Sequence, residues 1–320
     1  MKKNIILHVG LQKTATTFIQ LNIFPSLKNS YSTFYEDKNF YNTPFGELLI
    51  EINEIDKANQ FHLSKIIEYR IKIENFINEK EVQNIIISCE DLVGIIQLIY
   101  NNKEYFNNEK FSNILKAVMP ESKIFLVIRN QADWVESLYN QHIIKQNRFL
   151  KFNEFIGYKN TKFIQGKYLD INKLDWHKLV KTYNHLFGDK NVLVLPYEMF
   201  KANPKLFLEK FYNFFEIEPY YPETNPYVNT KKNILSIQTK PFLETYYKLI
   251  KNLPRNKFRI IIEKNSKYLQ KFLGFYVKSI DYSKEKFDSN TKKQFIELLK
   301  KSNQQLSELI NVDLSCYGYY

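Results

Sequence analysis

Four short runs that are apolar throughout, apart from His8 in the first, constrain the fold of this chain more than any other feature. Segments in which apolar residues recur at helical spacing separate them. A strand that is apolar at every position is buried on both faces, and strands that alternate with helices run parallel in one sheet. The pattern therefore predicts an α/β fold, in which helices cover both faces of a parallel sheet. The predicted strands cover residues 5–9, 85–87, 124–128 and 192–195.

The alternation ends at a group of three prolines. Pro219, Pro222 and Pro226 interrupt it, and the chain beyond them is rich in lysine and helical in period. Proline removes a backbone donor and breaks helices and strands, so this group favours a domain boundary. We expect an α/β domain over residues 1–226 and a lysine-rich helical extension over residues 227–320, packed on or near the functional site.

The basic charge is concentrated in that extension. The formal net charge is +12, but only five of the 46 basic residues are arginine. Arginine is the usual reader of base edges, so specific nucleic-acid binding is not favoured. Residues 227–300 hold 17 basic and 6 acidic residues. We expect this segment to be a solvated helix face, or to meet an acidic acceptor or an anionic membrane surface as a peripheral contact.

Two further features bear on location. No apolar run approaches the ~20 residues of a membrane-spanning helix, and residues 5–9 are too short for the core of a signal peptide. Cys89 and Cys316 lie far apart and have no second thiol or histidine at ligand spacing, so neither a disulfide framework nor a zinc site is supported. We expect a cytoplasmic protein without a metal.

A hydroxyl-rich turn with one lysine follows the first predicted strand and enters a helix. Such a turn directs backbone N–H groups and the positive end of a helix dipole at one point, which binds an anion such as a phosphate. An ordinary N-cap has the same composition, but ligands bind at the carboxyl ends of strands in α/β sheets, which favours a binding site. The turn consists of Gly10, Leu11, Gln12, Lys13, Thr14, Ala15, Thr16 and Thr17.

The spacing of this turn differs from that of a Walker A loop. Walker A has four residues between its first glycine and a Gly-Lys pair. Here only two residues separate Gly10 from Lys13, and no second glycine precedes the lysine. The shorter turn has less room for two phosphates with magnesium. A P-loop kinase or NTPase that uses Mg-ATP, with Asp91 holding the metal, is therefore the alternative.

An arginine directly after the third predicted strand marks a second anion site. Arg129 ends that strand, and Ser137 lies eight residues later within the next predicted helix. Because the carboxyl ends of parallel strands share one edge of the sheet, the guanidinium is expected in the same crevice as the first turn. There it is able to bind a second phosphate through paired N–H groups. Two such sites indicate a ligand with two separate phosphates.

With these two motifs the chain resembles the sulfotransferases that use 3′-phosphoadenosine 5′-phosphosulfate (PAPS). Residues 8–20 are similar to their 5′-phosphosulfate loop, especially to its Lys-Thr-Gly-Thr-Thr form in the bacterial and glycan-modifying branch. Residues 124–137 are similar to their 3′-phosphate motif, a hydrophobic strand followed by arginine and then serine at the eighth position. The resemblance covers about residues 1–230 and implies a P-loop-type sheet.

The resemblance implies a role for each matching residue. Lys13 would contact the oxygen that bridges phosphate and sulfate, the threonines of the first turn would hold the 5′-phosphate, and Arg129 with Ser137 would hold the 3′-phosphate. A late basic loop containing Lys231 would fold back over the donor. The residues expected to bind PAPS are Gly10, Lys13, Thr14, Ala15, Thr16, Thr17, Arg129, Ser137 and Lys231.

Two positions depart from the family's pattern. Ala15 stands where glycine is commoner, and Gln131 stands where proline is commoner. Alanine fits at its position if the backbone there is already helical.

Catalysis of sulfuryl transfer requires positioning and stabilisation of the charge on the leaving group. Lys13 would supply that charge. The step Ser88-Cys89-Glu90 resembles the Ser-x-Glu or Ser-Glu step in which glycan and tyrosine sulfotransferases keep a catalytic glutamate, so Glu90 is the first candidate for the general base. His142 is the second candidate, because cytosolic members of the family use histidine. The expected catalytic residues are Lys13, Glu90 and His142.

The expected reaction is transfer of a sulfuryl group from PAPS to a hydroxyl group, which leaves 3′,5′-ADP (PAP). The glycan-modifying form of the motifs favours a glycan or glycolipid as the acceptor. A further alternative is that the protein is not an enzyme but a basic module that binds an anionic glycan or a membrane through residues 227–300. Such binding would weaken steeply with salt and would survive the loss of Lys13.

Overall fold

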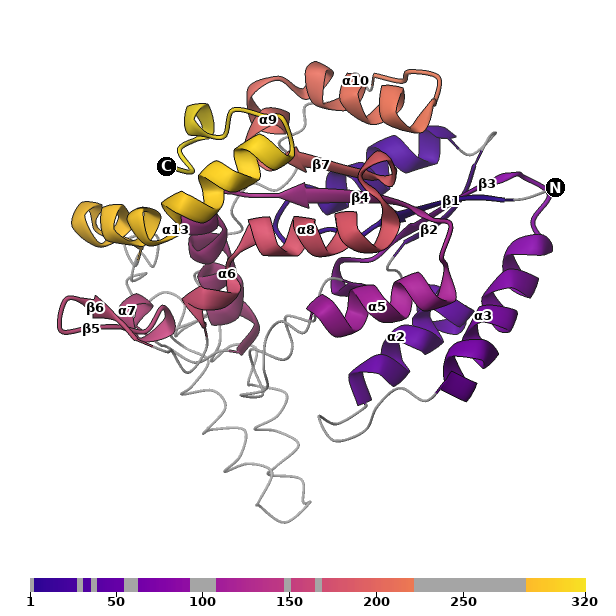
Figure 1. The fold of residues 1–320 in the computed structure, drawn as a ribbon, viewed down its shortest axis with the longest axis horizontal. Helices are drawn as coiled ribbons and strands as arrows, with labels where there is room; N and C mark the ends of the chain where they lie inside the picture. The colour runs from indigo at the N-terminus through magenta and orange to yellow at the C-terminus, as the bar shows by residue number, and fades with distance from the viewer. Residues whose placement is uncertain are drawn as a thin grey trace, which may run out of the picture.

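In the part of the chain that the structure describes, five parallel strands form the central sheet, in the order β2-β3-β1-β4-β7 (Figure 1). In this order the first strand of the chain lies in the middle, between β3 and β4. The computed structural model describes residues 3–27, 31–35, 39–54, 63–92, 108–146, 151–164, 169–221 and 286–320. The strands are β1 (Asn4–His8), β2 (Tyr31–Tyr35), β3 (Asn84–Ser88), β4 (Lys123–Ile128) and β7 (Val192–Pro196).

The four strands predicted from the sequence are confirmed, and β2 is an addition. β2 has the sequence Tyr-Ser-Thr-Phe-Tyr, and only Tyr31 within it is fully buried. Among the described strands it lies at the edge of the sheet and pairs with β3 alone. A strand at an edge has less of its surface covered, so it does not need an apolar residue at every position and lacks the signal that marks the central strands.

Helices cover both faces of the sheet, as predicted. Ile6, Ile86 and Phe125 point to one face, whereas Leu7 and Ile85 point to the other, because successive side chains of a strand alternate. The first face packs against α1 (Thr16–Phe18), the turns Ile19–Ile23 and Phe24–Leu27, α9 (Tyr197–Ala202) and α10 (Pro204–Phe215). The second packs against α2 (Pro44–Glu54), α3 (Leu63–Asn78), α5 (Asn108–Val118), α6 (Gln131–Gln146) and α8 (Trp176–Phe187).

The C-terminal helix packs against the same core. α13 (Ser289–Leu309) lies beside α8 and α6 and buries Phe295, Leu299 and Leu306. Near it lie the short helix α7 (Phe152–Phe155) and an antiparallel hairpin of β5 (Tyr158–Lys159) with β6 (Lys162–Phe163). The boundary predicted near residue 226 falls outside the described residues, so the two-domain division stays a prediction. Among the described helices, none is long and apolar enough to cross a membrane.

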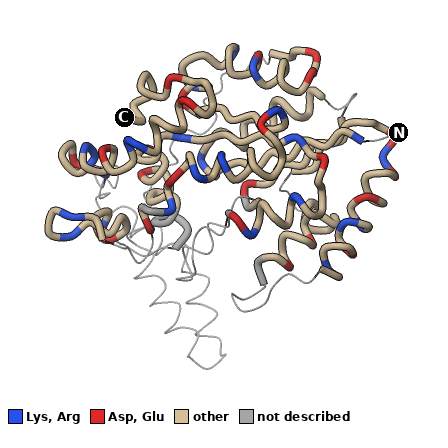
Figure 2. The backbone as a smooth tube through the Cα atoms, viewed as in Figure 1, with Lys and Arg blue, Asp and Glu red and all other residues tan. Residues whose placement is uncertain are grey.

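Most of the basic segment 227–300 also lies outside the described residues. Elsewhere basic and acidic residues are interspersed along the helices (Figure 2). On α3 they pair at helical spacing, with Lys72 Nζ 2.9 Å from Glu68 Oε1 and Arg70 Nε 3.0 Å from Glu74 Oε1. The side chains of these pairs are exposed, so this face of α3 is a solvated surface. Exposed pairs of this kind contribute little to stability.

Candidate active site

The turn between β1 and α1 has an unusual backbone. Lys13 and Ala15 both adopt positive φ, at 67° and 65°, in the left-handed region. The Thr14 hydroxyl between them donates a hydrogen bond to the carbonyl oxygen of Leu11. Alternation of left-handed residues with others turns successive N–H groups toward one side, which forms a concave binding site for an anion. Non-glycine residues in this region are strained, and such strain is concentrated at functional sites.

Ala15 does not meet the condition under which alanine fits this position, a backbone that is already part of the right-handed helix. Its φ of 65° and ψ of 14° are left-handed helical values, and α1 begins only at Thr16. In this conformation the Cβ of an L-residue approaches a carbonyl oxygen, which glycine avoids. Glycine would adopt this conformation without that strain.

We expect Ala15→Gly to raise the free energy of unfolding by about 0.5 kcal/mol, because relief of left-handed strain exceeds the entropy that glycine gains in the unfolded chain. Urea denaturation of the purified variants measures the change. Ala117→Gly, within the right-handed helix α5, serves as the matched control and should lower the free energy of unfolding by about 1 kcal/mol. Destabilisation by both substitutions would show that Ala15 is not strained.

Gly10 leaves little room for a side chain. A Cβ at this position would lie 3.0 Å from Thr16 Oγ1 and 3.3 Å from His8 Nε2. Thr16 Oγ1 is buried and has no hydrogen-bond partner within the described residues. A buried hydroxyl without a partner has lost its hydration, so an anionic oxygen placed in the turn would satisfy it. Gly10 thus contributes space, and Thr16 contributes a donor.

A neutral histidine joins this turn to the neighbouring strand. His8 Nδ1 lies 2.7 Å from Ser88 Oγ, and Gln20 Nε2 donates to the same oxygen at 3.0 Å. Complete burial lowers the pKa of His8 to about 3, so the imidazole carries no charge at neutral pH. The three side chains fix the carboxyl ends of β1 and β3 relative to each other, next to the turn.

Arg129 reaches the first turn directly. Its Nη1 donates to the carbonyl oxygen of Lys13 at 2.9 Å, although the two residues are 116 positions apart in the chain. Its guanidinium carbon lies 4.9 Å from the centre of the Tyr197 ring, and its Nε is buried without a partner in the described part of the chain. Trp134 of α6 adds a hydrogen bond from Nε1 to the carbonyl oxygen of Gln12 at 2.7 Å. The two predicted anion-binding motifs therefore lie in contact at one edge of the sheet.

Two tryptophans hold the backbone of the site, Trp176 at Arg129 and Trp134 at Gln12 in the first turn. Trp176 Nε1 donates to the carbonyl oxygen of Arg129 at 2.9 Å. The rings of Trp134 and Trp176 pack edge to face, 5.4 Å apart and inclined by 86°. Both side chains are fully buried, so the arginine projects from a rigid part of the core.

Glu90 lies at the same edge of the sheet as the first turn. It directly follows β3, begins a 3₁₀ turn (Glu90–Leu92) and is partly exposed. Cys89 N donates to the carbonyl oxygen of His8 at 3.3 Å, which holds the chain before Glu90 against the end of β1. Glu90 is therefore placed near the loop that would hold the donor.

Of the predicted residues that remain outside the first turn, the structure describes the side chain of Ser137 alone. Ser137 is partly buried on α6, about two turns after Arg129. His142 lies on the same helix, but its side chain is outside the described residues, as is that of Asp91. Lys231 falls entirely outside them. The roles of these residues stay predictions.

Residues after β7 also border the site, and the sequence reading missed them. Tyr197 stacks on Arg129, and the neighbouring Glu198 accepts a hydrogen bond from Asn130 N at 3.1 Å. Both follow the carboxyl end of a predicted strand, the same signal that identified Arg129. Applying that signal to every strand would have found them.

The donor groups of the site fit a ligand with two anionic ends. The strained turn offers backbone N–H groups and Thr16 Oγ1, and the adjacent arginine offers Nε. These donors are suited to phosphate and sulfate oxygens. Within the described residues, no group of three or more His, Cys, Asp or Glu side chains is arranged to hold a metal ion.

The model of the sulfotransferase domain family matches residues 3–233. No curated protein matches the chain. Three solved structures are similar to it in part. The sulfotransferase from Alicyclobacillus acidocaldarius is 13% identical, covers 76% of this chain and 93% of its own, and has a TM-score of 0.45. Mouse sulfotransferase SULT7A1 complexed with PAP is 16% identical, and the match covers 94% of this chain and 84% of the mouse chain with a TM-score of 0.40. The sulfotransferase domain from the curacin biosynthetic pathway is 11% identical, and the match covers 73% of this chain and 81% of that domain with a TM-score of 0.34.

Proposed function

The chain belongs to the sulfotransferase domain family and is a PAPS-dependent sulfotransferase, and we propose that it sulfates a hydroxyl group of a carbohydrate, on a glycan or a glycolipid. The first turn supports this acceptor, because its sequence is similar to the form found in the bacterial and glycan-modifying branch. The proposal places the enzyme in the cytoplasm, with residues 227–300 as a peripheral membrane contact.

The hydrogen bond from Arg129 Nη1 to the Lys13 carbonyl oxygen carries our assignment of the donor site. One nucleotide bridges two phosphate-binding groups only if they are adjacent. We assign the 5′-phosphosulfate to the turn of residues 10–17 and the 3′-phosphate to Arg129 with Ser137, with Lys231 closing over the donor. The family membership leaves no support for the Mg-ATP alternative, which the loop spacing already disfavoured.

The chain's own residues then divide the chemistry between them. PAPS supplies an activated sulfuryl group whose leaving group is a phosphate oxygen. Lys13 stabilises the negative charge that develops on that oxygen. The N–H groups of the turn hold the phosphosulfate so that the acceptor oxygen, the sulfur and the leaving oxygen lie in line. Glu90 accepts the proton of the acceptor hydroxyl, with His142 as the second candidate for this role.

Mass spectrometry of candidate glycans after incubation with the enzyme and PAPS tests the proposed acceptor. We expect one added sulfate per modified hydroxyl, and none when 3′,5′-ADP replaces PAPS. Tyrosine-containing peptides and simple phenols serve as competing acceptors in parallel reactions. Sulfation of these alone would contradict the carbohydrate proposal and leave the sulfotransferase activity intact.

A further inference from the structure

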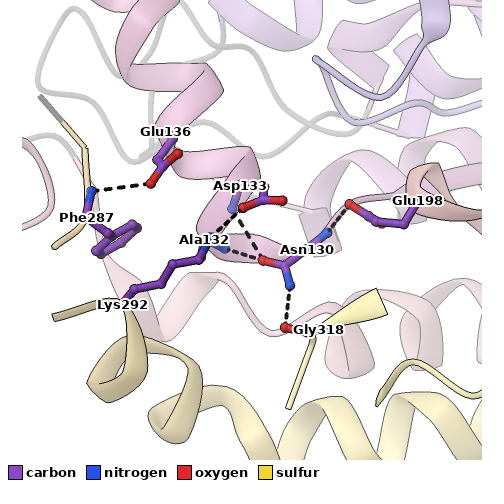
Figure 3. A network of polar contacts seen from close by, with 8 residues as sticks. All are labelled: Asn130, Ala132, Asp133, Glu136, Glu198, Phe287, Lys292 and Gly318. Atoms are coloured by element: carbon purple, nitrogen blue, oxygen red, sulfur yellow. Dashed lines mark hydrogen bonds and ion pairs between the residues drawn. The ribbon is translucent and has the colours of Figure 1, made fainter. Parts of the chain in front are cut away.

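Hydrogen bonds join the C-terminal tail (residues 314–320) to the turn between β4 and α6, which carries Arg129 (Figure 3). Asn130 Nδ2 donates to the carbonyl oxygen of Gly318 at 2.6 Å, and Asn130 N donates to Glu198 Oε1 at 3.1 Å. The other carboxylate oxygen, Glu198 Oε2, accepts from the hydroxyl of Tyr319 at 3.1 Å. The tail therefore contacts this turn both directly and through one carboxylate.

These contacts are buried, so they are costly to break. Tyr319 is 1% exposed and Asn130 is 4% exposed. Burial raises the pKa of the Tyr319 hydroxyl well above its ordinary value, so this group stays protonated and donates. Desolvation raises the pKa of Glu198, while its hydrogen bonds and the charge of Arg129 act in the opposite direction. A buried carboxylate that loses one donor is left partly unsatisfied.

A second set of bonds reaches the first residue of α6, next to this turn, from α13. Gln131 and Asn303 exchange two amide hydrogen bonds, from Gln131 Nε2 at 2.7 Å and from Asn303 Nδ2 at 3.1 Å. Asn303 Nδ2 also donates to the carbonyl oxygen of Tyr319 at 2.9 Å. The turn, the start of α6, the tail and α13 thus form one continuous buried network, whose hydrogen bonds join residues 16 to 188 positions apart in the chain.

Asn130 transmits this network to the arginine. Its Oδ1 accepts from the N–H groups of Ala132 at 3.0 Å and Asp133 at 3.3 Å, which caps the start of α6. Its backbone is covalently joined to Arg129, so rotation of Asn130 would redirect the guanidinium. A displacement of about 1 Å in such a group is enough to lose much of its effect.

We propose that the C-terminal tail positions Arg129 for the 3′-phosphate of the donor, with Tyr319 and Glu198 as positioning residues that act through Asn130. The inference rests on the proposed donor site, because it requires the 3′-phosphate at Arg129. It makes donor recognition depend on the last residues of the described chain, which no phosphate needs to touch.

Paired affinity measurements test this role. The ligands 3′,5′-ADP and 5′-AMP differ only in the 3′-phosphate, and calorimetry measures the dissociation constant of each. The dissociation constant of 5′-AMP divided by that of 3′,5′-ADP therefore reports how much the 3′-phosphate contributes to binding. We expect Tyr319→Phe to reduce this ratio by about tenfold, the effect of one hydrogen bond to a charged group. 5′-AMP affinity should stay within twofold of wild type. An unchanged ratio, or an equal loss for both ligands, overturns the positioning role.

Tyr320→Phe is the matched control, because it removes a hydroxyl one residue further along the tail that lies 3.3 Å from Ser307 Oγ and not at Glu198. It should leave both affinities unchanged. Glu198→Ala is the second variant and should reduce the same ratio, since it removes the carboxylate from between Tyr319 and Asn130. If wild type binds 3′,5′-ADP and 5′-AMP equally well, the assignment of the 3′-phosphate to Arg129 fails. If wild type prefers 3′,5′-ADP and Tyr319→Phe keeps that preference, only the positioning role of the tail fails.

Discussion

Replacing Lys13 with methionine should lower turnover about 10²- to 10³-fold, the usual loss when one group that stabilises developing charge is removed. Methionine keeps most of the length of the side chain and is as strained as lysine at a φ of 67°, so the backbone of the turn should persist. Affinity for 3′,5′-ADP should fall much less, because Arg129 binds the 3′-phosphate in our assignment. Turnover is measured as release of 3′,5′-ADP from PAPS with a saturating acceptor.

Lys205→Met provides the control for this substitution. Lys205 lies on α10, and its exposed ammonium is 3.9 Å from Glu209. The control removes the same charge at a site with no role in the reaction, so its turnover should equal that of wild type. Should Lys13→Met retain turnover within threefold of wild type, Lys13 does not stabilise the leaving group and the mechanism is wrong at its first step.

The central sheet was predictable because its strands are buried on both faces. Residues 124–128 have no polar member, and neither do residues 192–195, so packing alone determines their pattern. The parallel sheet in turn placed the turn at Gly10 and Arg129 close together, since the carboxyl ends of parallel strands lie on the same side of the sheet. The edge strand β2 escaped detection, because Ser32 and Thr33 within it are only partly buried.

The local geometry of the site was less predictable, because it depends on contacts between distant residues. The left-handed φ of Ala15 is a backbone property that composition does not reveal. Gln131 differs from the proline that is commoner in the family, and the structure gives this side chain a partner, Asn303 on α13. That pair joins positions 172 apart, so no local spacing identifies it. The contact of Tyr319 with Glu198 was missed for the same reason, because it joins positions 121 apart, whereas the place of Glu198 just after β7 was visible in the sequence.

Replacing Glu90 with glutamine should reduce turnover about 10²- to 10⁴-fold, because an amide cannot accept the proton of the acceptor hydroxyl. Glutamine has nearly the same shape, so the 3₁₀ turn after β3 and the bond from Cys89 N to His8 should remain. Binding of 3′,5′-ADP should be nearly unchanged, because neither phosphate is assigned to this carboxylate. Sulfation rate with saturating PAPS and acceptor gives the first quantity, and calorimetry gives the second.

Two further variants make this result specific. Glu218→Gln neutralises an exposed carboxylate that follows α10 and should turn over at the wild-type rate. His142→Gln tests the second candidate under the same conditions. If Glu90→Gln turns over normally while His142→Gln does not, the base is the histidine on α6 and Glu90 has no part in proton transfer. A loss in Glu90→Gln alone places the proton acceptor beside β1, where the buried pair of His8 and Ser88 fixes the end of β3.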